Sequence, residues 1–314
     1  MSTVRQLSLR RLAAAGTAIL WLAAPGLALA NQASLHLQIG DPARSGRELP
    51  LVLDGIRDTA NGDLVTPAEM AHRLVDTGIL FIGENHTNQD FHNVQFRSIK
   101  ALHEAGREVM VGLEMFPYTE QAVLDNWVAG RYTEEGFLAL GRWYENWSYN
   151  WNYYRDIFLY ARDHGIRMVA LNSPRPAVNT VRSKGFDALS PEERAHLPPQ
   201  IAPQTEAYMA LYRSVFSKDD ALHMKGPMLE GMYRAQTMWD ATMGWNALQA
   251  LQEHGGRNAI MVVLIGAGHV TYGLGAERQI APFYTGRISS LVPVTLVDDE
   301  GKPVKQVRAS YANF

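Results

Sequence analysis

The sequence predicts an α/β fold in which a mostly parallel central sheet is connected by helical crossovers. Apolar strands alternate with helical segments over the first half of the chain, and one more apolar strand follows a long stretch without strands. This alternation is typical of parallel sheets, because neighbouring parallel strands need long connections. The four core strands are expected at residues 79–82, 108–113, 166–171 and 259–265.

Cap and turn residues delimit the predicted helices. Thr66-Pro67-Ala68-Glu69 combines a threonine cap, a proline at the first helical position and a glutamate that completes a capping box, so a helix begins there. A short strand is expected just before it, at 51–53. Later helices, each followed by a glycine, are expected at about 88–105, 119–129 and 153–164.

The second half of the chain predicts a helical insertion and a terminal hairpin. Residues from about 176 to 257 contain no convincing strand, and helices fit 203–216 and 229–253. After the last core strand, two strand-like runs at 288–297 and 304–310 flank a turn around residue 300, which predicts a C-terminal hairpin.

The N-terminus predicts export. Residues 1–30 have a basic start without acidic residues, an apolar stretch and an Ala28-Leu29-Ala30 cleavage site, which together indicate a signal peptide. We favour a Sec signal over a twin-arginine signal, and we expect a periplasmic protein. Residues 31–50 are expected to be a loose leader, followed by one α/β domain over 51–314 that contains the insertion.

Composition excludes several classes of protein. There is no cysteine, so neither disulfides nor thiolate metal ligands are available. No second stretch is long and apolar enough to span a bilayer. Loss of the three arginines of the signal peptide would change the formal net charge from −3 to −6. No basic run interleaves with aromatic residues, so nucleic acid is not an expected partner.

Polar residues follow the ends of the predicted core strands. Two Gly-x-x-His sequences, Gly83–His86 and Gly266–His269, follow the first and last core strands, and Glu84 and Glu114 lie at neighbouring ends. Ligands of open parallel sheets bind at the carboxyl ends of strands. We therefore expect Glu84, His86, Glu114 and His269 to share one rim, where they bind a divalent metal ion or act as a general acid and base.

Further segments are expected near this rim. Asn172 and Arg175 follow the third core strand, and the arginine is suited to a carboxylate, including a porphyrin propionate, or to an ion pair with a rim glutamate. An aromatic stretch from Trp143 to Tyr160 could form core or wall a flat ligand. Gln236 and Asp240 lie on one face of a helix and are expected to contact one of the rim histidines.

Five motifs resemble those of the ChaN-like haem-binding family, which belongs to the wider Tiki/TraB and erythromycin-esterase superfamily. The motifs are Gly83-Glu84-Asn85-His86, Gly112-Leu113-Glu114-Met115-Phe116, Asn172-Ser173-Pro174-Arg175, Ala235–Met243 and Gly266-Ala267-Gly268-His269. The similarity covers roughly residues 51–280. It implies an α/β fold, haem as cofactor, a haem site at a homodimer interface and a role in haem or iron uptake with an outer-membrane receptor as partner.

The resemblance leaves the haem ligand and the chemistry open. A tyrosine ligates haem in family members, and the candidates here are Tyr149, Tyr153, Tyr154 and Tyr118. The rim motifs, by contrast, are shared with hydrolases of the superfamily. The alternative function is therefore a metal-dependent hydrolase, protease-like or esterase-like, in which the rim residues hold the ion or activate a water.

Overall fold

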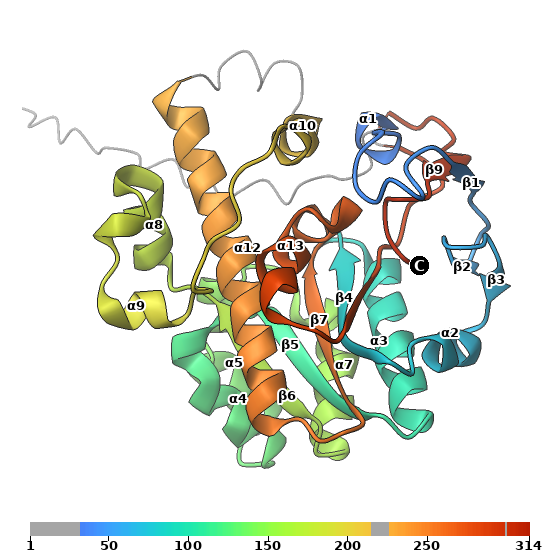
Figure 1. Ribbon diagram of the computed structural model, residues 1–314. Helices are drawn as coiled ribbons and strands as arrows, with labels where there is room; N and C mark the ends of the chain where they lie inside the picture. The colour runs from blue at the N-terminus through green and yellow to red at the C-terminus, as the bar shows by residue number, and fades with distance from the viewer. Residues whose placement is uncertain (1–31, 215–225, 299) are drawn as a thin grey trace, which may run out of the picture.

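The computed structural model describes residues 32–214, 226–298 and 300–314, and Figure 1 shows the arrangement of its elements. The predicted signal peptide, residues 1–30, lies outside the described residues. In the part of the chain that is described, no helix is long and apolar enough to cross a membrane.

A parallel five-stranded sheet forms the centre of the molecule and contains all four predicted core strands. The strand order is β6-β5-β7-β4-β8, so β7 lies between β4 and β5 although it comes much later in the sequence. The carboxyl ends of these three strands are therefore neighbours. The strands are β4 (Thr77–Glu84), β5 (Glu108–Pro117), β6 (Arg167–Asn172), β7 (Ala259–Gly266) and β8 (Arg287–Leu291).

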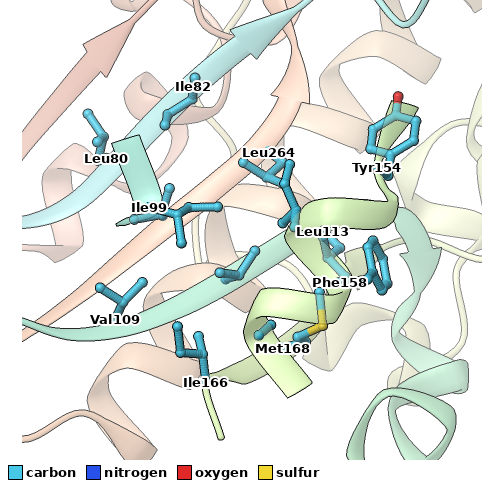
Figure 2. Packing of buried hydrophobic residues seen from close by; sticks show 14 of the residues in the cluster. Leu80, Ile82, Ile99, Val109, Leu113, Tyr154, Phe158, Ile166, Met168 and Leu264 are labelled. Carbon is cyan, nitrogen blue, oxygen red and sulfur yellow. The ribbon is translucent and has the colours of Figure 1, made fainter. Parts of the chain in front are cut away.

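One face of the sheet is covered by helices from the first half of the chain. Strand residues such as Leu80, Val111 and Leu264 pack there against Ile99 and Phe158, and Figure 2 shows this cluster. Tyr154 stands at its margin with the hydroxyl turned away from the apolar side chains (Figure 2). The helices are α2 (Pro67–Arg73), α3 (Gln89–Glu104), α4 (Gln121–Val128), α5 (Glu134–Leu140), α6 (Trp143–Asn146) and α7 (Arg155–Asp163).

The other face is covered mainly by α12 (Pro227–His254), which crosses the front of the sheet in Figure 1. Met243 and Leu248 of this helix pack on strand residues such as Phe81 and Val263. In its described part the predicted insertion contains helices and no strand, with an irregular segment over residues 196–205. Its other α-helices are α8 (Arg175–Lys184), α9 (Pro191–Ala195) and α10 (Glu206–Ser214), and α13 (Ala276–Ile280) follows β7.

The N-terminal segment is not loose where it is described. Residues 32–50 include α1 (Gln32–Leu35) and β1 (Glu48–Pro50), and Leu35 is fully buried in the apolar cluster beneath α12. The Tyr272 hydroxyl donates to the Ser34 carbonyl at 2.7 Å, which ties the segment to the body. Residues 51–53, where a strand was predicted, form no strand; the strand of this region is β1, which ends at Pro50. A small hairpin of β2 (Ile56–Arg57) and β3 (Leu64–Val65) follows.

The predicted C-terminal hairpin is corrected by the structure. Its first strand is β8, which pairs in parallel with β4, and its second is β9 (Gln306–Arg308), which pairs antiparallel with β1. The chain does reverse near residue 300, with an antiparallel bridge between Val297 and Pro303. Each of the two predicted strands forms a longer pairing with another strand, β8 with β4 and β9 with β1. The pairing between residues on the two sides of the turn is therefore limited to one bridge.

Candidate functional site

The rim of the sheet brings the two Gly-x-x-His motifs together. Glu84 ends β4 directly beside Gly266, the last residue of β7, and His269 follows in a 3-10 turn. Gly266 is required by close approach: a Cβ there would lie 3.1 Å from His86 Cε1 and 3.5 Å from Glu114 Oε2. The absence of a side chain at this glycine therefore lets His86 and Glu114 converge over β7.

In the first half of the site, hydrogen bonds link a tyrosine to a carboxylate and that carboxylate to a histidine. Glu84 Oε1 lies 2.7 Å from His86 Nδ1 and accepts a hydrogen bond of 2.6 Å from the Tyr154 hydroxyl. Glu84 Oε2 accepts a bond of 2.6 Å from Gln95 and lies 3.4 Å from His92 Nδ1. Glu84 is therefore fully engaged, and its side chain is completely buried.

The second half repeats this order with residues from other elements. Asp240 Oδ1 lies 2.6 Å from His269 Nδ1, and Asp240 Oδ2 accepts a hydrogen bond of 2.9 Å from the Tyr208 hydroxyl. The Gln236 amide nitrogen lies 2.9 Å from the same histidine nitrogen. Both helix residues expected to contact a rim histidine thus contact His269.

Glu114 lies between the two halves. Its Oε2 accepts a hydrogen bond of 2.5 Å from the Gly266 amide, and its Oε1 lies 3.5 Å from His269 Nε2. Each histidine has its Nδ1 against a carboxylate, which directs its Nε2 toward the rim. Among the described residues, no group of three or more His, Cys, Asp or Glu is placed to hold a metal ion. The predicted divalent-metal site is not supported at this rim.

The electrostatics of the first half favour the ionised forms of Glu84 and of its histidine partners. Burial alone would raise the pKa of Glu84, but the hydrogen bonds with His86 and His92 outweigh it and hold that pKa well below its usual range. Burial would lower the pKa of His86, yet the hydrogen bond with Glu84 and the charge of Glu114 raise it. The pKa of His92 is raised in the same way, by Glu84 against burial.

The electrostatics of the second half likewise favour the charged form of its histidine. The pKa of His269 is raised because, against the effect of burial, Asp240 accepts its hydrogen bond and the charges of Asp240 and Glu114 favour the imidazolium. Burial and the adjacent carboxylates raise the pKa values of Tyr154 and Tyr208 well above the usual value, so both stay neutral donors. Because their pKa values are raised, both imidazoles hold their proton to higher pH, and in that form each Nε2 is a hydrogen-bond donor at the rim.

The four candidate haem tyrosines lie in different surroundings. Tyr154 is buried with its hydroxyl on Glu84, and Tyr153 stacks on His92 with ring centroids 5.4 Å apart. Tyr118 stacks on His196 at 3.5 Å, at the end of β5. Tyr149 is half-buried beside His86, with ring centroids 5.0 Å apart. Of the four, Tyr149 lies directly on the rim.

The residues after β6 support the rim from the side. The Asn172 amide donates to the Glu114 carbonyl at 2.9 Å, which fixes the end of β5. Arg175 is exposed and donates to the carbonyls of Glu145 and Asn146 at 2.7 and 3.1 Å. The guanidinium therefore lies against the aromatic segment that carries Tyr149, and the alternative of an ion pair with Glu84 or Glu114 is not found among the described residues.

Sequence reasoning missed three residues of the site. His92 and Gln95 hold Glu84 from α3, and their spacing of three on a helix that begins just after the rim is a signal that could have found them. Tyr208 reaches Asp240 from α10, 32 positions earlier in the chain. No local pattern marks Tyr208, because its contact depends on how the insertion folds back on α12.

Comparison with known proteins assigns the family. Residues 70–280 match the model of the family described as "Haem-binding uptake, Tiki superfamily, ChaN", which is more than half of the chain. The chain belongs to the ChaN family. The match contains all five motifs and the whole of the described insertion.

Individual relatives extend this result. A ChaN structure from Campylobacter jejuni with cofacial haem has a TM-score of 0.59 at 16% identity, over 81% of this chain and 96% of that one, which shows the fold. The Arabidopsis thaliana chloroplastic protein RETICULATA-RELATED 5 is 27% identical over 73% of this chain. The matched part spans about a third of that relative's length. A mutant of erythromycin esterase EreC has a TM-score of 0.42 at 12% identity, over 71% and 72% of the two chains. That last likeness carries no functional argument.

Proposed function

We propose that this protein binds haem at the rim of its sheet and takes part in haem or iron uptake in the periplasm. Membership of a haem-binding uptake family supports the ligand, and the position of Tyr149 carries the assignment to the rim. Haem, when bound, supplies a ferric iron that accepts an oxygen or nitrogen ligand.

The surroundings of Tyr149 fit a flat, anionic ligand. No hydrogen bond to the Tyr149 hydroxyl occurs within the described chain, and burial together with the charges of Glu114 and Glu84 raises the pKa of this hydroxyl. Trp147 packs edge-on against His86 at 4.6 Å and extends the aromatic surface. Arg175 is held at the neighbouring backbone, and a guanidinium is a suitable partner for a propionate. We infer that Tyr149 would bind the haem iron, with His86 and Arg175 nearby.

Hemin titration of the purified protein tests this assignment. We expect a Soret band that saturates at micromolar hemin, and a loss of affinity of at least tenfold, about 1.4 kcal/mol, in Tyr149→Phe. Tyr153→Phe is the matched control, because it removes a hydroxyl from the same segment but leaves the rim tyrosine intact; its affinity should stay within twofold. Equal hemin binding by wild type and Tyr149→Phe would reject the ligand, and no binding at all would reject the function.

The periplasmic setting is a further part of the proposal. The basic start, apolar stretch and cleavage site of residues 1–30 support Sec-dependent export. Uptake would then involve transfer of haem from an outer-membrane receptor, and the family resemblance favours a homodimer that places two rims together. Fractionation of the native host locates the protein, and light scattering with and without hemin measures its oligomeric state. A cytoplasmic, monomeric protein in both states would contradict this setting.

A second candidate function rests on the two carboxylate–histidine pairs. Such pairs orient an imidazole for acid–base chemistry, and here both face one carboxylate, Glu114. This arrangement favours ester or amide hydrolysis in which Glu114 activates a water and a protonated histidine donates to the leaving group. An activated ester such as p-nitrophenyl acetate tests it: turnover should fall at least 100-fold in Glu114→Gln. Turnover unchanged in that variant would exclude a hydrolytic rim.

A further inference from the structure

A small pocket lined by three arginines lies where the N-terminal segment meets the turn after β2, the start of β8 and the last residues of the chain. Its volume is about 310 Å³, at the lower end of the roughly 300–1,000 Å³ that small-molecule sites occupy. In Figure 1 this region lies around the mark C, beside β2 and below β1 and β9. The charged residues that line the pocket are Asp41, Arg44, Arg47, Asp58 and Arg287.

The pocket is separate from the rim of the sheet. Arg287 is the first residue of β8 and pairs with Thr77, the first residue of β4. The rim follows the other ends of the strands, and none of the four rim residues lines the pocket. A ligand bound here therefore occupies a different site from haem at the rim.

Both aspartates of the pocket are already neutralised. Asp41 Oδ2 accepts a hydrogen bond of 2.8 Å from Arg44 Nε, and its Oδ1 accepts one of 2.9 Å from the Ala43 amide. The hydrogen bond from Arg44 holds the pKa of Asp41 below its usual value. Asp58 Oδ2 accepts a hydrogen bond of 2.6 Å from Arg73, which belongs to α2 and lies outside the pocket. Each carboxylate therefore has a cation of its own.

Two guanidiniums of the pocket have no carboxylate partner among the described residues. Arg47 donates from Nη2 to the carbonyls of Thr59 and Ala60 at 2.9 and 3.0 Å, which fixes its position but leaves its charge uncompensated. The Arg287 side chain is exposed and makes no hydrogen bond or ion pair within the described chain. The pocket therefore carries two uncompensated positive charges, and like charges that line one small volume repel each other.

The neutral part of the wall adds another donor. Asn313 Oδ1 accepts hydrogen bonds of 2.8 and 3.1 Å from the Ser290 amide and hydroxyl, so the Asn313 amide nitrogen remains without an acceptor in the described chain. Phe314, which also lines the pocket, forms no ion pair with Arg47 or Arg287 within the described residues. The groups of this wall that still lack a partner are thus hydrogen-bond donors.

Unused donors on two guanidiniums select an oxyanion. The oxygens of a phosphate group accept hydrogen bonds from arginine in pairs, and a phosphate dianion matches the charge of the two guanidiniums. A neutral ligand leaves that charge uncompensated, and a cation adds to it. The small volume selects a compact ligand. We propose that this pocket binds a phosphate dianion, either the free ion or the phosphate group of a small ester.

Calorimetric titration of the purified protein with inorganic phosphate and with glycerol 3-phosphate tests the proposal. We expect saturable binding with a Kd of about 1 mM or tighter, and the tighter of the two probes identifies the free ion or the ester as the ligand. Glycerol 3-phosphate should bind severalfold more tightly at about pH 7.5 than at about pH 5.5, because its phosphate ionises a second time near pH 6. Absence of saturable binding of both probes would overturn the proposal.

Arg287→Gln is the decisive variant, because its side chain makes no hydrogen bond or ion pair whose loss could unfold the protein. It should weaken phosphate binding at least tenfold, and Arg47→Gln should do so at least fivefold. Arg97→Gln is the matched control, since Arg97 is also exposed and without an ion pair in the described chain but lies outside the pocket. Its affinity should stay within twofold of wild type. Equal binding by Arg287→Gln and wild type would indicate an adventitious ion only and would overturn the proposal.

Hemin titration separates this site from the rim. Arg287→Gln should give the wild-type Soret band, and Tyr149→Phe should bind phosphate normally. Displacement of phosphate by hemin would contradict the proposal, because the pocket would then hold the haem propionates. Failure of hemin to bind anywhere leaves the phosphate site standing.

Discussion

The two halves of the rim reach the same arrangement from different parts of the fold. In one, Tyr154 donates to Glu84, which holds His86; in the other, Tyr208 donates to Asp240, which holds His269. Glu84 belongs to the sheet itself and lies two positions from its histidine. Asp240 lies on α12, 29 positions before His269, on the opposite face of the sheet.

The difference lies in how many groups hold each carboxylate. Glu84 has four partners, because Gln95 and His92 on α3 add to the tyrosine and the histidine. Asp240 has one partner on each oxygen. Several residues of the core thus hold the carboxylate of the first half, whereas the second half depends on α10 packing correctly against α12. Removing single contacts should therefore have unequal consequences in the two halves.

The largest effect is expected from removal of a carboxylate. Glu84→Ala removes the partner of four polar groups, three of them buried, so the free energy of unfolding should fall by about 3–5 kcal/mol, as for other broken buried pairs. The loss of unfolding free energy in Asp240→Ala should lie nearer the lower end of that range, since fewer partners are lost. Urea denaturation measures both, with exposed Glu145→Ala as a control expected within about 0.5 kcal/mol of wild type. Equal losses in the two halves would contradict the comparison.

Addition of one methyl group at the junction of the halves should have the next largest effect. Gly266→Ala places a Cβ 3.1 Å from His86 Cε1, and such overpacking costs about 1–3 kcal/mol. Hemin affinity should fall as His86 is displaced. Gly46→Ala is the matched control, because a Cβ there meets nothing within 4 Å. A Gly266→Ala protein as stable as Gly46→Ala would show that the halves do not converge as described.

The paired tyrosines provide a finer comparison. Tyr208→Phe leaves Asp240 Oδ2 without its donor and should cost about 2 kcal/mol, as expected for a hydrogen bond to a charged group. Tyr154→Phe should cost only about 1 kcal/mol, since His86 remains on the same oxygen of Glu84. Urea midpoints of the two variants test this order. A larger loss in Tyr154→Phe would reverse our ranking of the two halves.

The smallest expected effect is a dependence of stability on pH. The pKa of Glu84 is held below its ordinary 4.5, against the effect of burial, by its histidine partners, so its contribution is present above pH 4.5 and lost as pH falls through the lowered value. The pKa values of His86 and His269 are raised above the ordinary 6.5, despite burial, by their carboxylate partners. Their contribution is present below pH 6.5 and lost as pH rises through the raised values.

The urea midpoint should therefore be highest between about pH 4.5 and 6.5 and should decline on the alkaline side. His269→Gln should show a smaller alkaline decline than wild type, because one of the three imidazoliums with a raised pKa, those of His86, His92 and His269, is gone. A midpoint that rises steadily from pH 6 to 9 would contradict the charged state proposed for the rim.

The sheet and the four rim residues could be predicted from the sequence for a physical reason. Long apolar strands and the glycines after them are local signals, so Glu84, His86, Glu114 and His269 were expected on one rim, where the structure places them. Pairings between distant segments have no such signal. The partners of β8 and β9, the contact of Tyr208 with Asp240 and the arginine-lined pocket at the start of β8 all depend on tertiary packing.

Resonance Raman spectroscopy of the haem complex tests the central claim most directly, because it identifies the atom bound to iron. We predict an iron–tyrosinate band in the wild-type complex, retained in Tyr153→Phe and absent in Tyr149→Phe. A complex whose spectrum shows only histidine ligation, unchanged by Tyr149→Phe, would contradict the assignment of the rim tyrosine as the haem ligand.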